Sequence, residues 1–303
     1  MTIGAASALP LATSPGGPIP PGVEEKFVEA GGVTFRYLQG GPTHAGPTTG
    51  VPLLFLHGYP TWAEVWLPLA QILGGRHSWV APDLPCHHRT SPLPGKDRSV
   101  TSYREAVLAF LDTLPFERVA VVGSSLGGTL AVMLALERPE LVSRLVLLDA
   151  AGLTPKVPGR VVRLYLPFLV PAAVQAPSPA AVHALLRRAV FYDLRYADEG
   201  WVRTMVEDWA PPDRRKAYVA TGFALRRPDA SVAGALEHIT IPTYVIWGRE
   251  DPQFLWGEGE AASRRMPTSQ FAVLSGCGHF PMVERSMETA NLLTDFLAED
   301  VGL

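Results

Sequence analysis

The chain is poor in several features that mark particular classes of protein. Its 303 residues contain two cysteines, Cys86 and Cys277, too few for a disulfide framework. Charged residues make up 18% with a net charge of -3, and there is no basic stripe of the kind that binds nucleic acid. No CxxC or H-E-x-x-H spacing indicates a metal site, and no apolar run is long enough to span a membrane. These absences favour a globular protein without metal, nucleic acid or a membrane span.

The composition predicts one large core and a mobile start. Hydrophobic residues are 47% of the chain, enough for a core with an inserted lobe. Residues 1–22 are rich in Ala, Pro, Gly and Ser, and we expect them to form a mobile extension. The first basic residue is Lys26, so the charged start of a signal peptide is missing and a cytoplasmic location is expected.

Short apolar runs alternate with helical spacing along residues 23–153 and again along 238–303. Because the runs are apolar on both faces, they predict an α/β fold, a mostly parallel, eight-stranded, doubly wound sheet with helices on both sides. Gly31-Gly32 predicts a hairpin, and Ser102–Glu105 is typical of a capping box at a helix start. Residues 154–237 show helical patches and no strand pattern, which predicts an inserted helical cap. Strands are expected at 26–30, 33–37, 51–56, 78–81, 119–123, 145–148, 244–247 and 270–274.

The stretch with the clearest chemical content runs from Val119 to Gly128. An apolar strand ends in Gly123, and an apolar helix follows directly, with G-x-S-x-G between them. Side chains beside such a corner would clash, so glycines flank it, and the corner residue Ser125 is expected to have a strained backbone. Its hydroxyl would then project at the carboxyl end of the sheet. Taken alone, the motif also fits a solvated serine in a tight connection.

Other polar side chains follow the ends of other strands, and such ends meet at one edge of a parallel sheet. A serine hydroxyl needs a base, and His279, in a Gly-flanked loop after the last strand, is the best one. Asp251 precedes it after another strand and is expected to orient the imidazole, with Asp149 as the alternative. Asp83 has the wrong chain order and is expected to order its own loop.

A hydrolytic serine also needs backbone N–H groups to bind the oxyanion that forms on attack. Leu126 N–H, at the start of the helix after Ser125, is one candidate. The second should come from the loop after Leu56, and because Pro60 has no N–H, Tyr59 is the natural choice. His57 is then expected to anchor that loop.

Together these motifs resemble the α/β-hydrolase fold superfamily, in its capped serine hydrolase and esterase branch, from about Val23 to the C-terminus. The resemblance implies a nucleophile elbow at Ser125, Asp251 as the acid, a cap between the sixth and seventh strands of the main sheet, and no cofactor. It rests on His57-Gly58-Tyr59-Pro60, Pro82-Asp83-Leu84-Pro85, Gly123-Ser124-Ser125-Leu126-Gly127-Gly128, Gly248-Arg249-Glu250-Asp251 and Gly278-His279-Phe280-Pro281.

The resemblance implies a serine hydrolase that cleaves small-molecule carboxylic esters. Haloalkane dehalogenases and epoxide hydrolases of this fold carry Asp where this chain has Ser125. C–C bond hydrolases often have Asn before the nucleophile and Trp after the base, where this chain has Ser124 and Phe280. A C–C bond hydrolase, a cofactor-free perhydrolase and a catalytically silent ligand-binding or receptor protein stay open as alternatives.

Two regions distinguish this chain within the family. Many members continue the Pro82–Pro85 loop with Gly-His-Gly, where this chain has Cys86-His87-His88. Adjacent residues rarely converge on one metal, so we expect an ordinary loop with altered backbone preferences, and Cys277 is expected to be a small packed side chain. Residues 161–170 are strongly apolar, and they are expected either to pack on the core or to line a substrate pocket. In the second case Leu166 and Phe168, together with Phe280, would contact small to medium apolar substrates.

Overall fold

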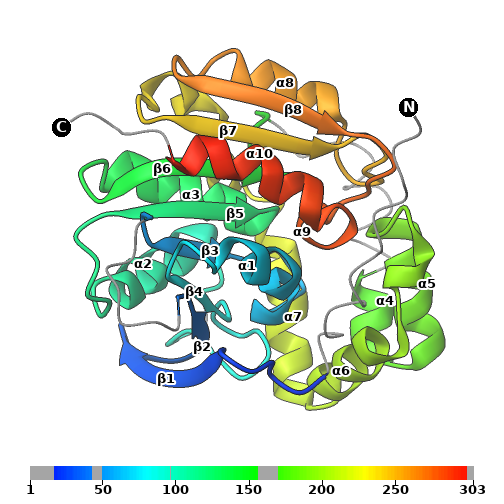
Figure 1. Ribbon diagram of the computed structural model, residues 1–303. Coiled ribbons are helices and arrows are strands. Elements are labelled where there is room, and N and C mark those ends of the chain that lie inside the picture. Colours follow the sequence, from blue (N-terminus) through cyan, green and yellow to red (C-terminus); the bar gives the residue numbers. More distant parts are fainter. Residues whose placement is uncertain (1–16, 43–49, 96, 156–169, 299–303) are drawn as a thin grey trace.

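The computed structural model describes residues 17–42, 50–95, 97–155 and 170–298. They contain one eight-stranded sheet in the order β1-β2-β4-β3-β5-β6-β7-β8 (Figure 1). β2 is antiparallel to both β1 and β4, and all other neighbouring pairs are parallel. The strands are β1 (Glu24–Ala30), β2 (Val33–Gly40), β3 (Leu53–Leu56), β4 (Trp79–Pro82), β5 (Val119–Ser124), β6 (Val142–Leu148), β7 (Thr243–Gly248) and β8 (Ser269–Leu274).

The β1–β2 hairpin confirms the turn predicted from the sequence. Ala30 pairs with Val33 across Gly31 and Gly32, whose φ angles are 57° and 77°. Glycine reaches this left-handed region without the steric penalty that a Cβ would bring. Of the extension predicted at residues 1–22, residues 17–22 are the ones that the structure describes.

Helices cover both faces of the sheet. The central strands β3, β5, β6 and β7 are buried along their whole length, which explains why their sequences are apolar on both faces. α1 (Leu67–Leu73) contacts α10 (Ser286–Ala298) on one side, and α2 (Val100–Leu111) contacts α3 (Leu126–Glu137) on the other (Figure 1). α8 (Trp256–Ser263) packs against β7 and β8. The predicted doubly wound α/β sheet is therefore confirmed.

Helix starts are less well predicted than the sheet. The capping box expected at Ser102–Glu105 is wrong, because α2 begins earlier and its N-cap is Ser99. The Ser99 hydroxyl accepts a hydrogen bond from Ser102 N at 3.2 Å and donates to Asp97 at 2.7 Å. A short 3-10 helix, η1 (Ala63–Trp66), also precedes α1.

Between β6 and β7 the chain leaves the sheet, in the segment for which the sequence predicts a helical cap. We call residues 170–238 the helical insertion. Figure 1 shows the helices of residues 170–209 beside the ends toward which β7 and β8 point. The insertion contains α4 (Val170–Gln175), α5 (Pro179–Ala189), η3 (Leu194–Tyr196), α6 (Glu199–Trp209), α7 (Pro212–Ala224), η4 (Pro228–Ala230) and η5 (Ala233–His238).

No helix among the described residues of the chain combines the length and apolar character needed to cross a membrane.

Candidate active site

Ser125 lies at the corner between β5 and α3, as the motif predicts. Its φ and ψ are 51° and -119°, a conformation that L-residues rarely adopt and that functional sites tend to hold under strain. A Cβ at Gly123 would collide with Gly127 O, and a Cβ at Gly127 would collide with Leu56 O. The glycines therefore let α3 approach both β5 and β3, and this close approach forces the sharp corner.

The loop after β3 runs directly against this serine. A Cβ added at Gly58 would lie 2.7 Å from Ser125 Cβ, so Tyr59 follows at the point where the backbone passes the hydroxyl. Leu126 is the first residue of α3, and the first N–H groups of a helix have no partner within it. Leu126 thus follows Ser125 directly in the chain, whereas Tyr59 follows a glycine that packs against Ser125 in space.

His279 and Asp251 meet as a buried pair. His279 Nδ1 and Asp251 Oδ2 are 2.9 Å apart, and both side chains are 0% exposed. Asp251 Oδ1 accepts a second hydrogen bond from Gln253 N at 2.7 Å, which fixes the carboxylate. His279 Nε2 is buried and has no hydrogen-bond partner among the described residues. The structure does not join it to Ser125 by a hydrogen bond, so this nitrogen is left to receive a proton.

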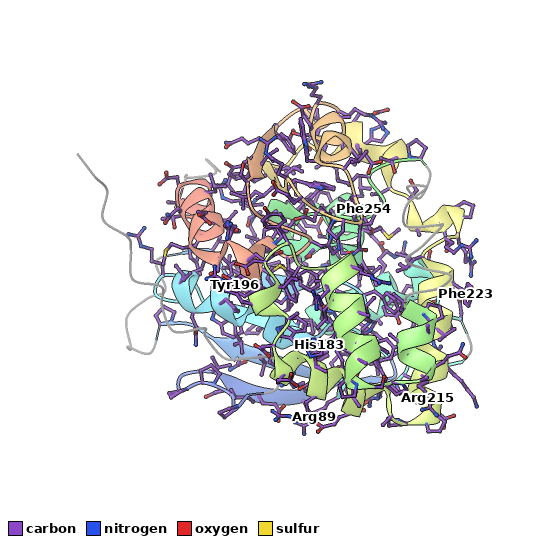
Figure 2. All side chains as sticks on the ribbon, turned by 90° about the vertical axis from the view of Figure 1, so that its right-hand side faces the viewer. Arg89, His183, Tyr196, Arg215, Phe223 and Phe254 are labelled. Carbon is purple, nitrogen blue, oxygen red and sulfur yellow. The ribbon has the colours of Figure 1, made fainter. Side chains whose placement is uncertain are left out.

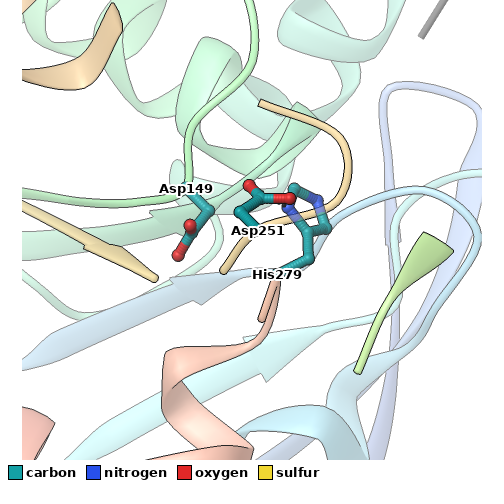
Figure 3. Close-up of side chains that lie close together, drawn as sticks. All are labelled: Asp149, Asp251 and His279. Atoms are coloured by element: carbon teal, nitrogen blue, oxygen red, sulfur yellow. Dashed lines mark hydrogen bonds and ion pairs between the residues drawn. The ribbon is translucent and has the colours of Figure 1, made fainter. Parts of the chain in front are cut away.

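Asp149, the alternative acid, lies next to Asp251 (Figure 3), but its hydrogen bond joins it to Gly248. Its Oδ1 accepts from Gly248 N at 2.9 Å, so it ties the end of β6 to the end of β7. Burial, together with the nearby charge of Asp251, raises the pKa of the Asp149 carboxyl, which favours its neutral form.

The ligand atoms of Asp149, Asp251 and His279 lie within 4.8 Å of one another, a spacing that could in principle hold a metal ion. The direct Asp251–His279 hydrogen bond already uses the imidazole Nδ1. A carboxylate that orients an imidazole in this way is the arrangement of an acid–base pair.

His57 and Asp83 have the anchoring roles expected for them. His57 Nε2 accepts from Leu84 N at 2.7 Å, and Nδ1 donates to Gly58 O at 2.9 Å. Burial holds the pKa of His57 well below its usual range, so it stays neutral. Asp83 accepts from Ala63 N at 2.8 Å and pairs with the Arg36 guanidinium at 3.2 Å.

The helical insertion contacts this site through aromatic side chains. Phe280 is 1% exposed, and its ring lies 5.5 Å from that of His279, 5.7 Å from Phe191 and 6.0 Å from Trp201. Phe280 therefore joins the base to α6, on the side of the molecule that faces the viewer in Figure 2. Its predicted contact with substrate stays a prediction. The other two predicted substrate residues, Leu166 and Phe168, lie outside the described residues.

The departure at Cys86-His87-His88 keeps a glycine-like backbone. Cys86 and His88 have φ angles of 68° and 44°, at the two positions where the resemblance leads us to expect glycine. His87 is buried with Nδ1 2.9 Å from Pro85 O, and the His88 ring stacks on Trp62. The segment therefore forms a packed loop.

The other cysteine, Cys277, is also buried. Burial raises the pKa of its thiol, so the thiol stays protonated.

Glu284, which belongs to none of the sequence motifs described above, is 2% exposed and accepts hydrogen bonds from three backbone N–H groups. The available signal was a glutamate among the apolar residues of Pro281–Glu284, directly after the His279 loop. A carboxylate placed there has to be paired or hydrogen-bonded if it is buried.

The chain belongs to the alpha/beta hydrolase fold family, whose model matches residues 51–286. It is 29% identical over 296 residues to an uncharacterized protein of Mycobacterium tuberculosis, covering 89% of this chain and 82% of that protein. It is 25% identical to the monoacylglycerol lipase ABHD6 of Bos taurus, covering 91% and 83%. Among solved structures, a membrane phospholipase A described as a bacterial virulence factor superposes with a TM-score of 0.80 at 27% identity, covering 91% and 86%. The fold and these relatives identify the chain as a hydrolase.

Proposed function

We propose that the protein is a serine hydrolase that cleaves carboxylic esters of small to medium apolar substrates through an acyl-enzyme intermediate. The observation that carries the proposal is a strained serine, 7% exposed, at the sheet edge that also carries a buried Asp–His pair. Ser125 is the nucleophile, His279 the general base and Asp251 the acid.

In the first half of the reaction, His279 Nε2 takes the proton from Ser125 Oγ as this oxygen attacks the ester carbonyl carbon. Asp251 accepts from His279 Nδ1 and stabilises the imidazolium that results. The oxyanion accepts hydrogen bonds from Leu126 N–H and Tyr59 N–H. One such donor contributes about 3–4 kcal/mol to the transition state.

Collapse of this intermediate breaks the bond to the alcohol oxygen, and His279 returns the proton to the leaving alcohol. In the second half, His279 removes a proton from water, which attacks the acyl-enzyme. The carboxylic acid leaves, and Ser125 regains its proton. The chain therefore supplies every group that the two steps require.

The names of two relatives support an ester as the substrate class. A monoacylglycerol lipase and a phospholipase A are both named for the hydrolysis of acyl esters. The aromatic rings that join His279 to the insertion are compatible with an apolar acyl or alcohol group near the base.

Labelling with a fluorophosphonate, followed by turnover of p-nitrophenyl esters, tests the proposal. We expect one serine to be labelled, p-nitrophenol to be released catalytically, and labelling to block that release. Labelling without turnover would identify a binding or receptor protein on the same scaffold. A chain that neither reacts nor turns over would contradict the proposal.

A further inference from the structure

Glu284 joins two segments that are distant in the sequence. It is the last residue of α9 (Pro281–Glu284), which begins two residues after His279. Its Oε1 accepts from Gly278 N at 2.9 Å. Its Oε2 accepts from Tyr192 N and Asp193 N, both at 2.9 Å. One buried carboxylate therefore holds the loop of the base and the stretch of the helical insertion that follows α5.

Other contacts press the same two segments together. His279 N donates to Val190 O at 2.8 Å, and a Cβ added at Gly278 would lie 2.5 Å from that carbonyl oxygen. Gln253, two residues after the acid, donates from Nε2 to Ala189 O at 2.8 Å. Residues 189–193 thus lie against the loops that carry both Asp251 and His279.

We propose that Glu284 is a positioning residue that fixes His279 to residues 189–193, so that the base is in place only when the helical insertion is docked. This inference rests on the proposed role of His279. Glu284 touches no reacting atom, and it acts through the backbone on either side. Docking of the helical insertion over the site would thereby hold His279 in its catalytic position.

The charge state of Glu284 gives this coupling a pH dependence. Burial raises the pKa of Glu284 to about 7, against the opposing effect of its three N–H donors and of Arg285. Only the carboxylate accepts at both oxygens without having to donate, so protonation breaks the described arrangement. Coupling is therefore expected above about pH 7 and is lost below it. The titratable residues near Glu284 are Arg285 beside it and, in the core, Cys277 and Asp149, whose pKa values its charge raises. From the insertion, Asp193 contacts it through a backbone N–H, and the Tyr196 hydroxyl donates to Glu284 O.

Glu284→Gln tests the inference, because it keeps the shape of the side chain and removes the charge. We expect kcat for a p-nitrophenyl ester at pH 8 to fall roughly tenfold or more, with KM changed by less than about threefold. In the parent, the acid limb of log(kcat/KM) against pH should have a slope of about two, because protonation of Glu284 adds to that of the catalytic base. The variant lacks the Glu284 carboxylate, so its slope should fall to about one. Glu288→Gln is the matched control, since that carboxylate is 59% exposed and pairs with Arg285 at 3.7 Å.

Hydrogen exchange at the amides of Tyr192 and Asp193 tests the contact without any substrate. In Glu284→Gln these amides should exchange faster than in the parent. In the parent, their protection, corrected for intrinsic exchange, should fall between pH 8 and pH 6, which decides the matter even if the variant does not fold. Unchanged protection and an unchanged acid slope would overturn the inference. If esters are not turned over at all, the proposed function fails, whereas the exchange result still judges the contact.

Discussion

At the scale of single residues, two carboxylates lie beside the imidazole and have different partners. Asp251 contacts His279 Nδ1 at 2.9 Å, whereas Asp149 accepts from Gly248 N. Only Asp251 can therefore fix the tautomer of His279 and stabilise its charged form. Asp149 instead joins two neighbouring strand ends.

This difference predicts how two matched variants rank. Asp251→Asn should lower kcat by roughly 10⁴-fold, because the amide stabilises the wrong tautomer of His279. Asp149→Asn should cost far less, since a neutral amide can still accept from Gly248 N. Steady-state kinetics on a p-nitrophenyl ester measures both. The reverse ranking would move the acid to the end of β6.

Single residues also show what the sequence could and could not reveal. Ser125 could be predicted because a strand, a glycine-flanked serine and a helix are adjacent in the chain. Asp251 and His279 could be placed because the ends of parallel strands share one edge. The proposed role of Glu284 was hidden, because two of its three backbone N–H partners, Tyr192 and Asp193, are 92 and 91 positions away and reach it only through the docking of the insertion.

At the scale of elements, the loop after β4 keeps left-handed residues where glycine would be easier. Cys86 has a φ of 68°, and the left-handed region costs a non-glycine residue about 1–2 kcal/mol. The buried Cys277 does not have a positive φ. Glycine would therefore relieve backbone strain at position 86 but not at position 277.

Replacing each cysteine by glycine separates strain from packing. Cys86→Gly and Cys277→Gly both lose a buried thiol, but only the first relieves left-handed strain. We expect the free energy of unfolding of Cys86→Gly to exceed that of Cys277→Gly by about 1–2 kcal/mol. Urea unfolding monitored by tryptophan fluorescence measures both values. An equal or larger loss in Cys86→Gly would contradict the strain that we assign to this loop.

Element boundaries show where sequence patterns lose resolution. The apolar runs located the central strands β3, β5, β6 and β7, because burial on both faces leaves little choice of residue. The start of α2 was misplaced by three residues, since Ser99 and Ser102 are both able to cap a helix. Asp97 accepts from the hydroxyls of both serines, but the Ser99 hydroxyl accepts from Ser102 N, which makes Ser99 the N-cap.

At the scale of the whole molecule, an α/β core carries a helical insertion on the side of the strand ends. The core could be predicted from the alternation of strand and helix patterns, because the apolar residues of each strand indicate that the strand is buried. The position of the insertion relative to the core could not, since contacts such as Tyr59 with Tyr218 and Phe280 with Trp201 join distant parts of the chain. Substrate preference belongs to this scale, because it depends on what the two parts enclose.

If the apolar residues 161–170 line a substrate pocket, kcat/KM should rise from acetyl toward medium-chain p-nitrophenyl esters. Each buried methylene contributes up to ~0.8 kcal/mol, or a few-fold in rate when it is expressed in the transition state. Leu166→Ala and Phe168→Ala should flatten this trend more than they lower acetate turnover. A flat profile in the parent, or one unchanged in both variants, would remove this segment from the binding site.

The proposed mechanism depends above all on Ser125 as the nucleophile. Its neighbour Ser124 is the last residue of β5 and is wholly buried, so the two hydroxyls form a matched pair. Ester turnover and fluorophosphonate labelling of Ser125→Ala and Ser124→Ala, each with an unfolding curve to verify the fold, make the most direct test. We expect Ser125→Ala to lose labelling and several orders of magnitude in kcat, whereas Ser124→Ala should keep both labelling and turnover. An active Ser125→Ala beside a dead, folded Ser124→Ala would contradict this mechanism.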